Sequence, residues 1–173
     1  TAINIPGYHF SQDIGLPELP QINKLIEIPQ DAIPRIEIIS QEVSYYQLDE
    51  LNINNPIFPH QPSLSKSQTI DDVSLYWDNN YYSNNSFNNK NIVTLDIKGT
   101  LRSARIGNLN INPINYNPVE KTLKILKNIE FNIYFDDANY IKTNKLKNKY
   151  YSPYYNDIYK TISNYNPVLL DND

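Results

Sequence analysis

The sequence predicts an all-β protein, an antiparallel β-sandwich of jelly-roll-like form with one short C-terminal helix. Apolar and polar residues alternate in four stretches, and this period of two is that of a strand with one face on a core. Twelve prolines and many asparagines separate these stretches, as the turns of a β protein require. The length of 173 residues fits a single domain over 1–173.

The expected strands follow an irregular N-terminal segment over 1–20, which is punctuated by glycine and proline. Strands are predicted over 22–28, 34–40, 93–99 and 122–135, where β-branched and other apolar residues take every second position. The last stretch has apolar residues at most odd positions and mostly polar residues at even positions over fourteen residues. It is therefore expected to form one long strand or a hairpin.

Three segments are predicted to be loops. Residues 54–68 cannot form a central strand, because their prolines lack the N–H that a strand donates to its neighbour. Residues 78–91 are rich in asparagine, which tolerates turns. Residues 136–151 are expected to form a polar connection, with the lysines of the run Lys142–Lys149 in solvent.

A helix is predicted over 152–164. Ser152 is a suitable N-cap, and Pro153 suits the first helical position. The apolar stripe at helical spacing consists of Tyr155, Ile158, Tyr159 and Ile162.

Composition excludes several classes of protein. The net charge of −4 and the pI near 5.1 argue against a nucleic-acid partner. No Cys is present, which excludes disulfides and thiol catalysis, and no apolar run is long enough to span a membrane. The absence of Met indicates a processed or excised piece, from which any signal peptide is already removed.

Residues suited to catalysis are few. His9 and His60 are the only candidates for proton shuttles at neutral pH, and neither lies in a recognisable motif. The acidic pairs Asp71–Asp72 and Asp136–Asp137 lack the spacing of a calcium loop and are interpreted as turn residues. The residues therefore predict a protein that is not an enzyme and needs no metal or other cofactor.

The segment "GTLRSARIGNLNINPINYNPVEKTLKILKNIEFNIYF", residues 99–135, resembles the N-terminal prodomains of gingipain-type cysteine peptidases. Those prodomains share a G-x-x-R sequence near a strand, then P-x-x-Y-N-P, then an alternating strand. "GLPELPQINKLIEIPQDA" and "SPYYNDIYKTISNY" resemble the opening and the end of the same prodomains. The resemblance covers nearly the whole chain in the expected order.

The resemblance implies a function. Such a prodomain keeps the zymogen inactive, helps the peptidase to fold and be exported, and presents a basic side chain to the acidic specificity pocket of a Lys- or Arg-specific, caspase-like catalytic domain. The matching position here is Lys66, with Leu64 and Ser65 before it and Ser67 after it. The protein would be secreted or periplasmic. The catalytic Cys and His belong to the following domain in that family.

The charge pattern around Lys66 agrees with this role. Lys66 is the only Lys or Arg between Arg35 and Lys90, in a span with seven acidic residues. The neighbouring prolines would pre-extend the loop and reduce its ordering entropy on binding. A solvated loop lysine is the alternative, Lys90 is the second candidate for the basic residue, and Arg102 and Arg105 are expected to be structural.

A second function remains open at this point. The aromatic and asparagine-rich stretch from Trp77 to Tyr82 could form the contact surface of an extracellular carbohydrate-binding or adhesive β-sandwich. That reading predicts an exposed, flat row of aromatic rings.

Overall fold

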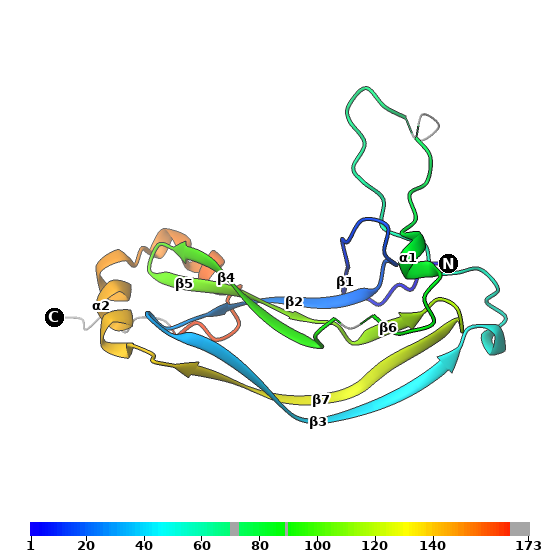
Figure 1. Ribbon diagram of the computed structural model, residues 1–173. Helices are drawn as coiled ribbons and strands as arrows, with labels where there is room; N and C mark the ends of the chain where they lie inside the picture. Colours follow the sequence, from blue (N-terminus) through cyan, green and yellow to red (C-terminus); the bar gives the residue numbers. More distant parts are fainter. Residues whose placement is uncertain (70–72, 89, 167–173) are drawn as a thin grey trace. The chain divides into compact units, whose positions relative to one another are not determined.

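A computed structural model describes residues 1–69, 73–88 and 90–166, and its strands form two antiparallel sheets (Figure 1). This confirms the all-β prediction. One sheet has four strands in the order β1 (His9–Phe10), β2 (Pro20–Glu27), β5 (Ala104–Ile111) and β4 (Val93–Leu101). The other has three in the order β3 (Ile33–Gln47), β7 (Thr122–Asp136) and β6 (Ile114–Asn117).

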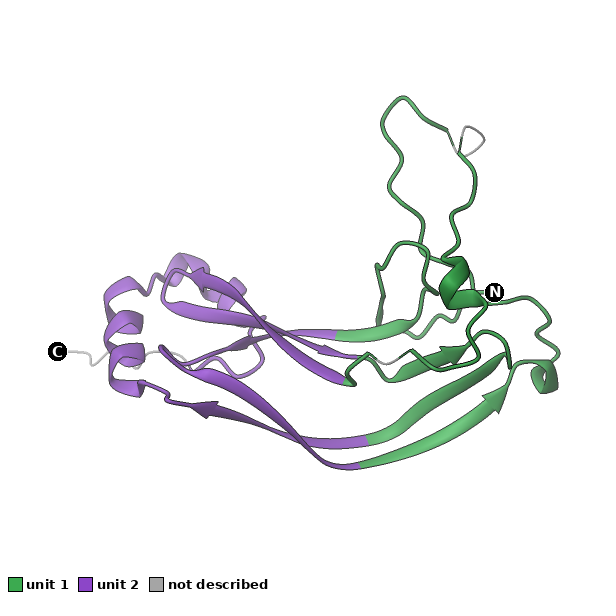
Figure 2. Ribbon diagram, in the orientation of Figure 1, with its two compact units in different colours: residues 1–22, 41–92, 112–128 green, residues 23–40, 93–111, 129–173 purple. Residues whose placement is uncertain are grey.

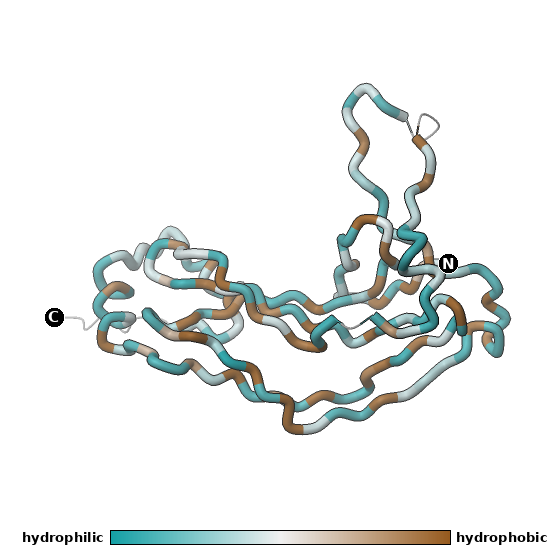
Figure 3. Tube along the Cα trace, viewed as in Figure 1, coloured by the Kyte–Doolittle hydropathy of each residue, from teal (hydrophilic) through white to brown (hydrophobic). Residues whose placement is uncertain are grey.

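The long alternating stretch is a single strand, β7, and not a hairpin. From Asn128 onward its side chains alternate between exposed polar residues and half-buried apolar ones such as Phe131. Figure 3 shows the same alternation of hydropathy along this strand. The polar positions face solvent, so the alternation in the sequence reports directly which face of β7 is turned inward.

The predicted strand over 93–99 becomes the first arm of a hairpin. β4 pairs antiparallel with β5 from Val93 opposite Ile111 to Leu101 opposite Ala104. The register shifts between Ile97 and Gly99, and Gly99 has a φ of 140°, which a residue without a Cβ adopts most easily. The bulge explains why the apolar alternation stops there.

Helical segments correct the loop and helix predictions at three places in the described chain. The asparagine-rich loop contains a short helix, α1 (Asn79–Tyr82), whose first N–H groups are capped by Asp78. The expected polar connection over 136–151 contains the helix α2 (Tyr140–Tyr150). The expected helix over 152–164 is instead a 3-10 turn, η3 (Pro153–Tyr155), followed by a short helix, α3 (Asn156–Tyr159). Another 3-10 turn, η1 (Asp49–Leu51), follows β3.

Local hydrogen bonds explain these corrections. Ser152 makes no side-chain cap bond, whereas the carbonyl oxygen of the Asn139 side chain accepts from Lys142 N–H and so begins α2. α2 has no wide apolar stripe, which is why hydrophobic periodicity did not predict it. Among the described helices α2 is the longest, and it is too short to cross a bilayer.

The chain folds into two compact units (Figure 2). Unit 1 comprises residues 1–22, 41–92 and 112–128, and unit 2 comprises 23–40, 93–111 and 129–173. The core of unit 1 is built from Leu48, Ile57, Ile114, Tyr116 and Leu123. A core in unit 2 is built from Ala104, Tyr159 and Ile162.

Candidate functional site

The candidate site is formed by two arms of one loop in unit 1, residues 57–69 and 73–77, which extend away from the rest of that unit in Figures 1 and 2. Its first residue, Ile57, is fully buried in the core of unit 1. The Tyr82 hydroxyl donates a hydrogen bond of 2.8 Å to the Ile57 carbonyl, and Phe58 N–H donates one of 2.9 Å to the Thr1 carbonyl. The loop therefore leaves the unit from a fixed point.

The first arm of the loop pairs with the irregular N-terminal segment. Glu18 N–H donates to the Phe58 carbonyl at 3.0 Å, and His60 N–H donates to the Leu16 carbonyl at 2.8 Å. Gly15 N–H returns a bond of 2.8 Å to the His60 carbonyl. Prolines in both segments are thus accommodated in isolated bridges at the edge of the unit, as their missing N–H groups require.

The returning arm is held at the same place. Asp78 N–H donates to the Gly15 carbonyl at 3.1 Å, and the Tyr76 ring lies against Gly15. A Cβ at position 15 would come within 2.5 Å of that ring, and Gly15 has a φ of +80°. Only glycine satisfies both conditions without strain.

Side-chain contacts also join the two arms at this neck. The Gln61 amide bonds both the N–H and the carbonyl of Tyr76. The Phe58 and Trp77 rings meet edge to face, with 6.1 Å between their centroids. Residues 58–61 and 76–78 form the base of the loop, its neck.

The tip of the loop is a tight turn around Lys66. Gln68 N–H donates to the Ser65 carbonyl at 3.1 Å, which places Lys66 and Ser67 at the two central positions. The Gln68 side-chain oxygen accepts from Ser65 N–H at 3.1 Å and from the Ser65 hydroxyl at 3.0 Å. These local bonds shape the turn from within.

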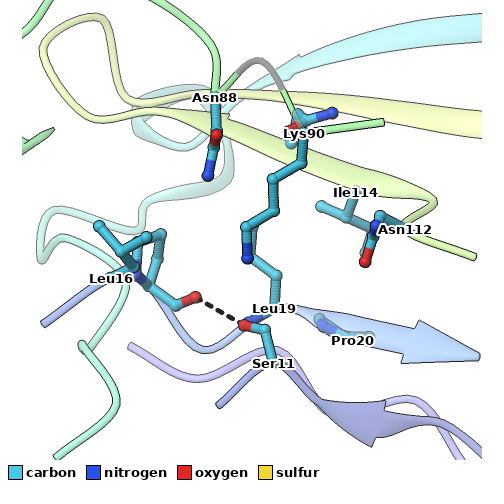
Figure 4. A pocket seen from close by; sticks show the side chains of 10 residues that line it. Ser11, Leu16, Leu19, Pro20, Asn88, Lys90, Asn112 and Ile114 are labelled. Atoms are coloured by element: carbon cyan, nitrogen blue, oxygen red, sulfur yellow. Dashed lines mark hydrogen bonds between the residues drawn. The ribbon is translucent and has the colours of Figure 1, made fainter. Parts of the chain in front are cut away.

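The two candidate lysines have different surroundings. Lys66 is exposed, and no ion pair joins it to any residue in the described part of the chain. Lys90, the second candidate, forms an ion pair with Asp13. Figure 4 shows its side chain running into a pocket beside Leu19, and this cavity of about 20 Å³ has room for little more than a water molecule.

The residues on either side of Lys66 share its exposure. Leu64, Ser65 and Ser67 are exposed, like Lys66, and lie at or beside the turn. Asp71 and Asp72, interpreted above as turn acids, lie outside the described residues. Arg105 donates bonds of 2.7 and 3.0 Å to the carbonyls of Pro29 and Ala32, in keeping with a structural role.

The aromatic residues from Trp77 to Tyr82 do not form a flat row. Trp77 meets Tyr82 edge to face at 4.7 Å between centroids, and Tyr81 meets Tyr82 in the same way at 5.3 Å. The Tyr81 hydroxyl donates to the Tyr116 carbonyl at 2.6 Å. Burial raises the pKa of the Tyr81 and Tyr82 hydroxyls above that of a free tyrosine. These rings serve packing and not a stacking surface for sugars.

Residues suited to catalysis or metal binding are dispersed. His60 Nδ1 lies 2.8 Å from the Glu18 side-chain oxygen at the neck, and His9 lies exposed in β1. Within the described residues, no three His, Asp or Glu side chains gather as a metal site would require.

Comparison with known proteins decides the family. The model of the family Propeptide_C25 matches residues 3–163 of the chain. The chain belongs to the C25 propeptide family. It therefore corresponds to the propeptide of a zymogen and is not itself an enzyme.

Relatives of this propeptide are found among gingipains. Lys-gingipain and Lys-gingipain W83 of Porphyromonas gingivalis are each 32% identical over 163 residues, which is 94% of this chain. The chain spans only 9% of the length of these curated relatives.

Solved structures of gingipains share the fold of this chain. A structure of gingipain K from P. gingivalis, described as giving insight into zymogenic latency, has a TM-score of 0.70 and 33% identity. The match covers 77% of this chain and 72% of the gingipain K chain. A complex of the pro- and mature domains of RgpB from P. gingivalis shares the fold, with a TM-score of 0.63 and 22% identity, covering 76% of this chain and 64% of that chain.

Sequence reasoning missed the neck of the loop. Gln61, Gly15 and Tyr76 are far apart in sequence, and no periodic pattern links them. Two local signals exist: a glycine before "LPELP", and a glutamine that Pro62 restricts to an extended conformation. Neither signal indicates which residue the side chain meets.

Proposed function

We propose that this propeptide inhibits a secreted, gingipain-like cysteine peptidase by presenting Lys66 to the specificity pocket, and that it assists folding and export of that peptidase. The single observation that carries the proposal is the tip of the loop. Lys66 occupies an exposed turn on a loop that stands away from unit 1, without an ion pair to a described residue. The loop is anchored at its neck, and its Lys66 side chain is exposed to solvent.

The physical gain comes from charge pairing and a pre-formed shape. A lysine ammonium that leaves water for a pocket containing a carboxylate forms a desolvated pair, and removal of one partner from such a pair costs about 2–5 kcal/mol. The bonds within the turn and at the neck reduce the conformational entropy lost on binding. Lys in place of Arg favours a peptidase that accepts lysine, since the compact ammonium and the planar guanidinium fit differently.

The partner follows from the relatives. The gingipain K structure concerns zymogenic latency, and the RgpB structure contains a prodomain bound to a mature domain. A caspase-like catalytic domain is therefore the expected partner of this chain, outside the cytoplasm. An interface on the order of 1,600 Å² would suffice for a stable inhibitory complex.

The test is inhibition by the purified chain. Mature Lys-gingipain of P. gingivalis serves as the probe, with hydrolysis of a lysine peptide as the readout. Lys66→Ala should raise the inhibition constant tenfold or more, which corresponds to about 1.4 kcal/mol per decade. Lys145→Ala, at an exposed position of α2, is the matched control and should inhibit like the wild type. Full inhibition by Lys66→Ala would exclude the proposed mechanism.

A further inference from the structure

The side-chain amide of Gln61 links the two arms of the Lys66 loop by hydrogen bonds. Gln61 Nε2 donates to the Tyr76 carbonyl at 3.0 Å, and Gln61 Oε1 accepts from Tyr76 N–H at 2.8 Å. The amide thus occupies the place of a paired residue in an antiparallel ladder. Nε2 also donates to the Pro59 carbonyl at 2.9 Å, so both amide hydrogens have acceptors.

The two hydrogen bonds between Gln61 and Tyr76 form a clamp between the arms, and beyond this clamp the arms separate. Phe58, Gln61, Leu64, Val73 and Leu75 are among the residues that line a cavity of about 470 Å³ between them. Leu64, Val73 and Leu75 are 40%, 37% and 56% exposed, so they are only loosely packed. The distance between the arms at the tip therefore depends on contacts at the neck more than on packing along the arms.

Gln61 is itself held rigidly on the side of the unit. Its neighbour His60 is fixed by backbone bonds to Leu16 and Gly15, and Pro62 restricts Gln61 to an extended conformation. The clamp therefore transmits the fixed position of the first arm to the returning arm. The bonds of Gln61 to Tyr76 are exposed to solvent, so water can replace them when the side chain is changed.

We infer that Gln61 is the positioning residue of the inhibitory loop: it closes the neck so that Lys66 is presented in one geometry and the loop remains an inhibitor rather than a substrate. This inference rests on the proposed function of Lys66. Hydrolysis of the Lys66–Ser67 amide by water would leave a carboxylate on Lys66 and an amine on Ser67. The clamp keeps the two arms together and so opposes release of those ends.

Proteolysis and amide exchange test the clamp without any assumption about the natural peptidase. Gln61→Met keeps the length of the side chain and removes its hydrogen bonds. Trypsin, used as a lysine-cleaving probe, should cut Lys66–Ser67 about tenfold faster in this variant, as followed by mass spectrometry. Tyr76 N–H should exchange at least tenfold faster, while Tyr82 N–H, bonded to the Asp78 carbonyl in α1, keeps its rate.

Gln47→Met changes an exposed glutamine in β3 and should leave the cleavage rate unchanged. The denaturation midpoint of Gln61→Met should equal that of the wild type, which separates positioning from a general loss of stability. Wild-type cleavage and exchange rates in Gln61→Met would overturn the inference.

Inhibition assays separate this inference from the proposed function. With mature Lys-gingipain as the probe, Gln61→Met should inhibit about tenfold more weakly and be cleaved after Lys66 during the assay. If Lys66→Ala inhibits fully, the proposed function fails even when Gln61→Met shows a loosened loop. If Lys66→Ala fails to inhibit while Gln61→Met inhibits like the wild type without cleavage, the positioning role alone is wrong.

Discussion

At the scale of residues, one lysine of the run Lys142–Lys149 is buried although the sequence does not distinguish it from the others. Lys147 is 5% exposed, whereas Lys142, Lys145 and Lys149 are exposed. Its ammonium donates bonds of 2.7 Å to Glu27 and to the Asn166 carbonyl, and it lies 4.3 Å from the centroid of the Tyr165 ring. The sequence predicted solvated lysines throughout, because composition alone does not distinguish one position of the run from another.

The Lys147–Glu27 pair gives a prediction for stability. Lys147→Met should lower the free energy of unfolding by about 3–5 kcal/mol, because it leaves the Glu27 carboxylate buried without its cation. The double variant Lys147→Met, Glu27→Leu should recover much of this loss. Urea denaturation followed by circular dichroism measures both, with Lys145→Met as the exposed control. A loss in Lys147→Met no larger than in that control would contradict the prediction.

At the scale of elements, strands were predictable where one face is buried, and helices were not. β7 alternates from Asn128 to its end because the odd positions from Ile129 onward face inward. α2 depends instead on the Asn139 cap and on Thr143, whose hydroxyl oxygen accepts from Gln30 N–H at 2.8 Å. These tertiary contacts carry no periodic signal. The prolines predicted a loop around Lys66 and the family resemblance singled out Lys66 in it, but the neck of the loop depends on pairings between distant segments.

The N-cap of α2 gives the second stability prediction. Asn139→Ala should lower the free energy of unfolding by about 1 kcal/mol, since the first turn of α2 loses its acceptor for Lys142 N–H. Asn148→Ala, at an exposed position inside the same helix, should leave stability equal or slightly higher, because alanine is the better helix former. Chemical denaturation of both variants checks the difference, and an equal response of the two would argue against the cap.

At the scale of the whole molecule, buried hydroxyls link stability to high pH. Burial raises the pKa of Tyr81, Tyr82 and Tyr116 in the folded state. The unfolded chain loses the corresponding protons near pH ~10, so it binds fewer protons than the folded chain above that pH. Stability is therefore fully present below pH ~10 and falls as the pH rises further.

Denaturation at a series of alkaline pH values checks whether the free energy of unfolding falls as the pH rises. The free energy of unfolding should stay level up to pH ~10 and then decrease, and absorbance at 295 nm should show a late-titrating group of tyrosines. Tyr81→Phe should be less stable by about 1 kcal/mol at neutral pH, because the bond to the Tyr116 carbonyl is lost. The free energy of unfolding of Tyr81→Phe should fall less steeply at alkaline pH than that of the wild type. If the free energy of unfolding falls with pH as steeply in Tyr81→Phe as in the wild type, Tyr81 does not contribute to the alkaline loss of stability.

β3 has a practical consequence for anyone who prepares this domain alone. It is fifteen residues long, forms one margin of its sheet, and carries Ile33 and Ile39 at 62% and 51% exposure. An edge strand has backbone N–H and C=O groups without a partner strand, and here apolar side chains lie beside them. Such an edge can pair with the same strand of another molecule. Concentrated stocks should therefore self-associate, and Ile39→Lys should keep them monodisperse in light scattering.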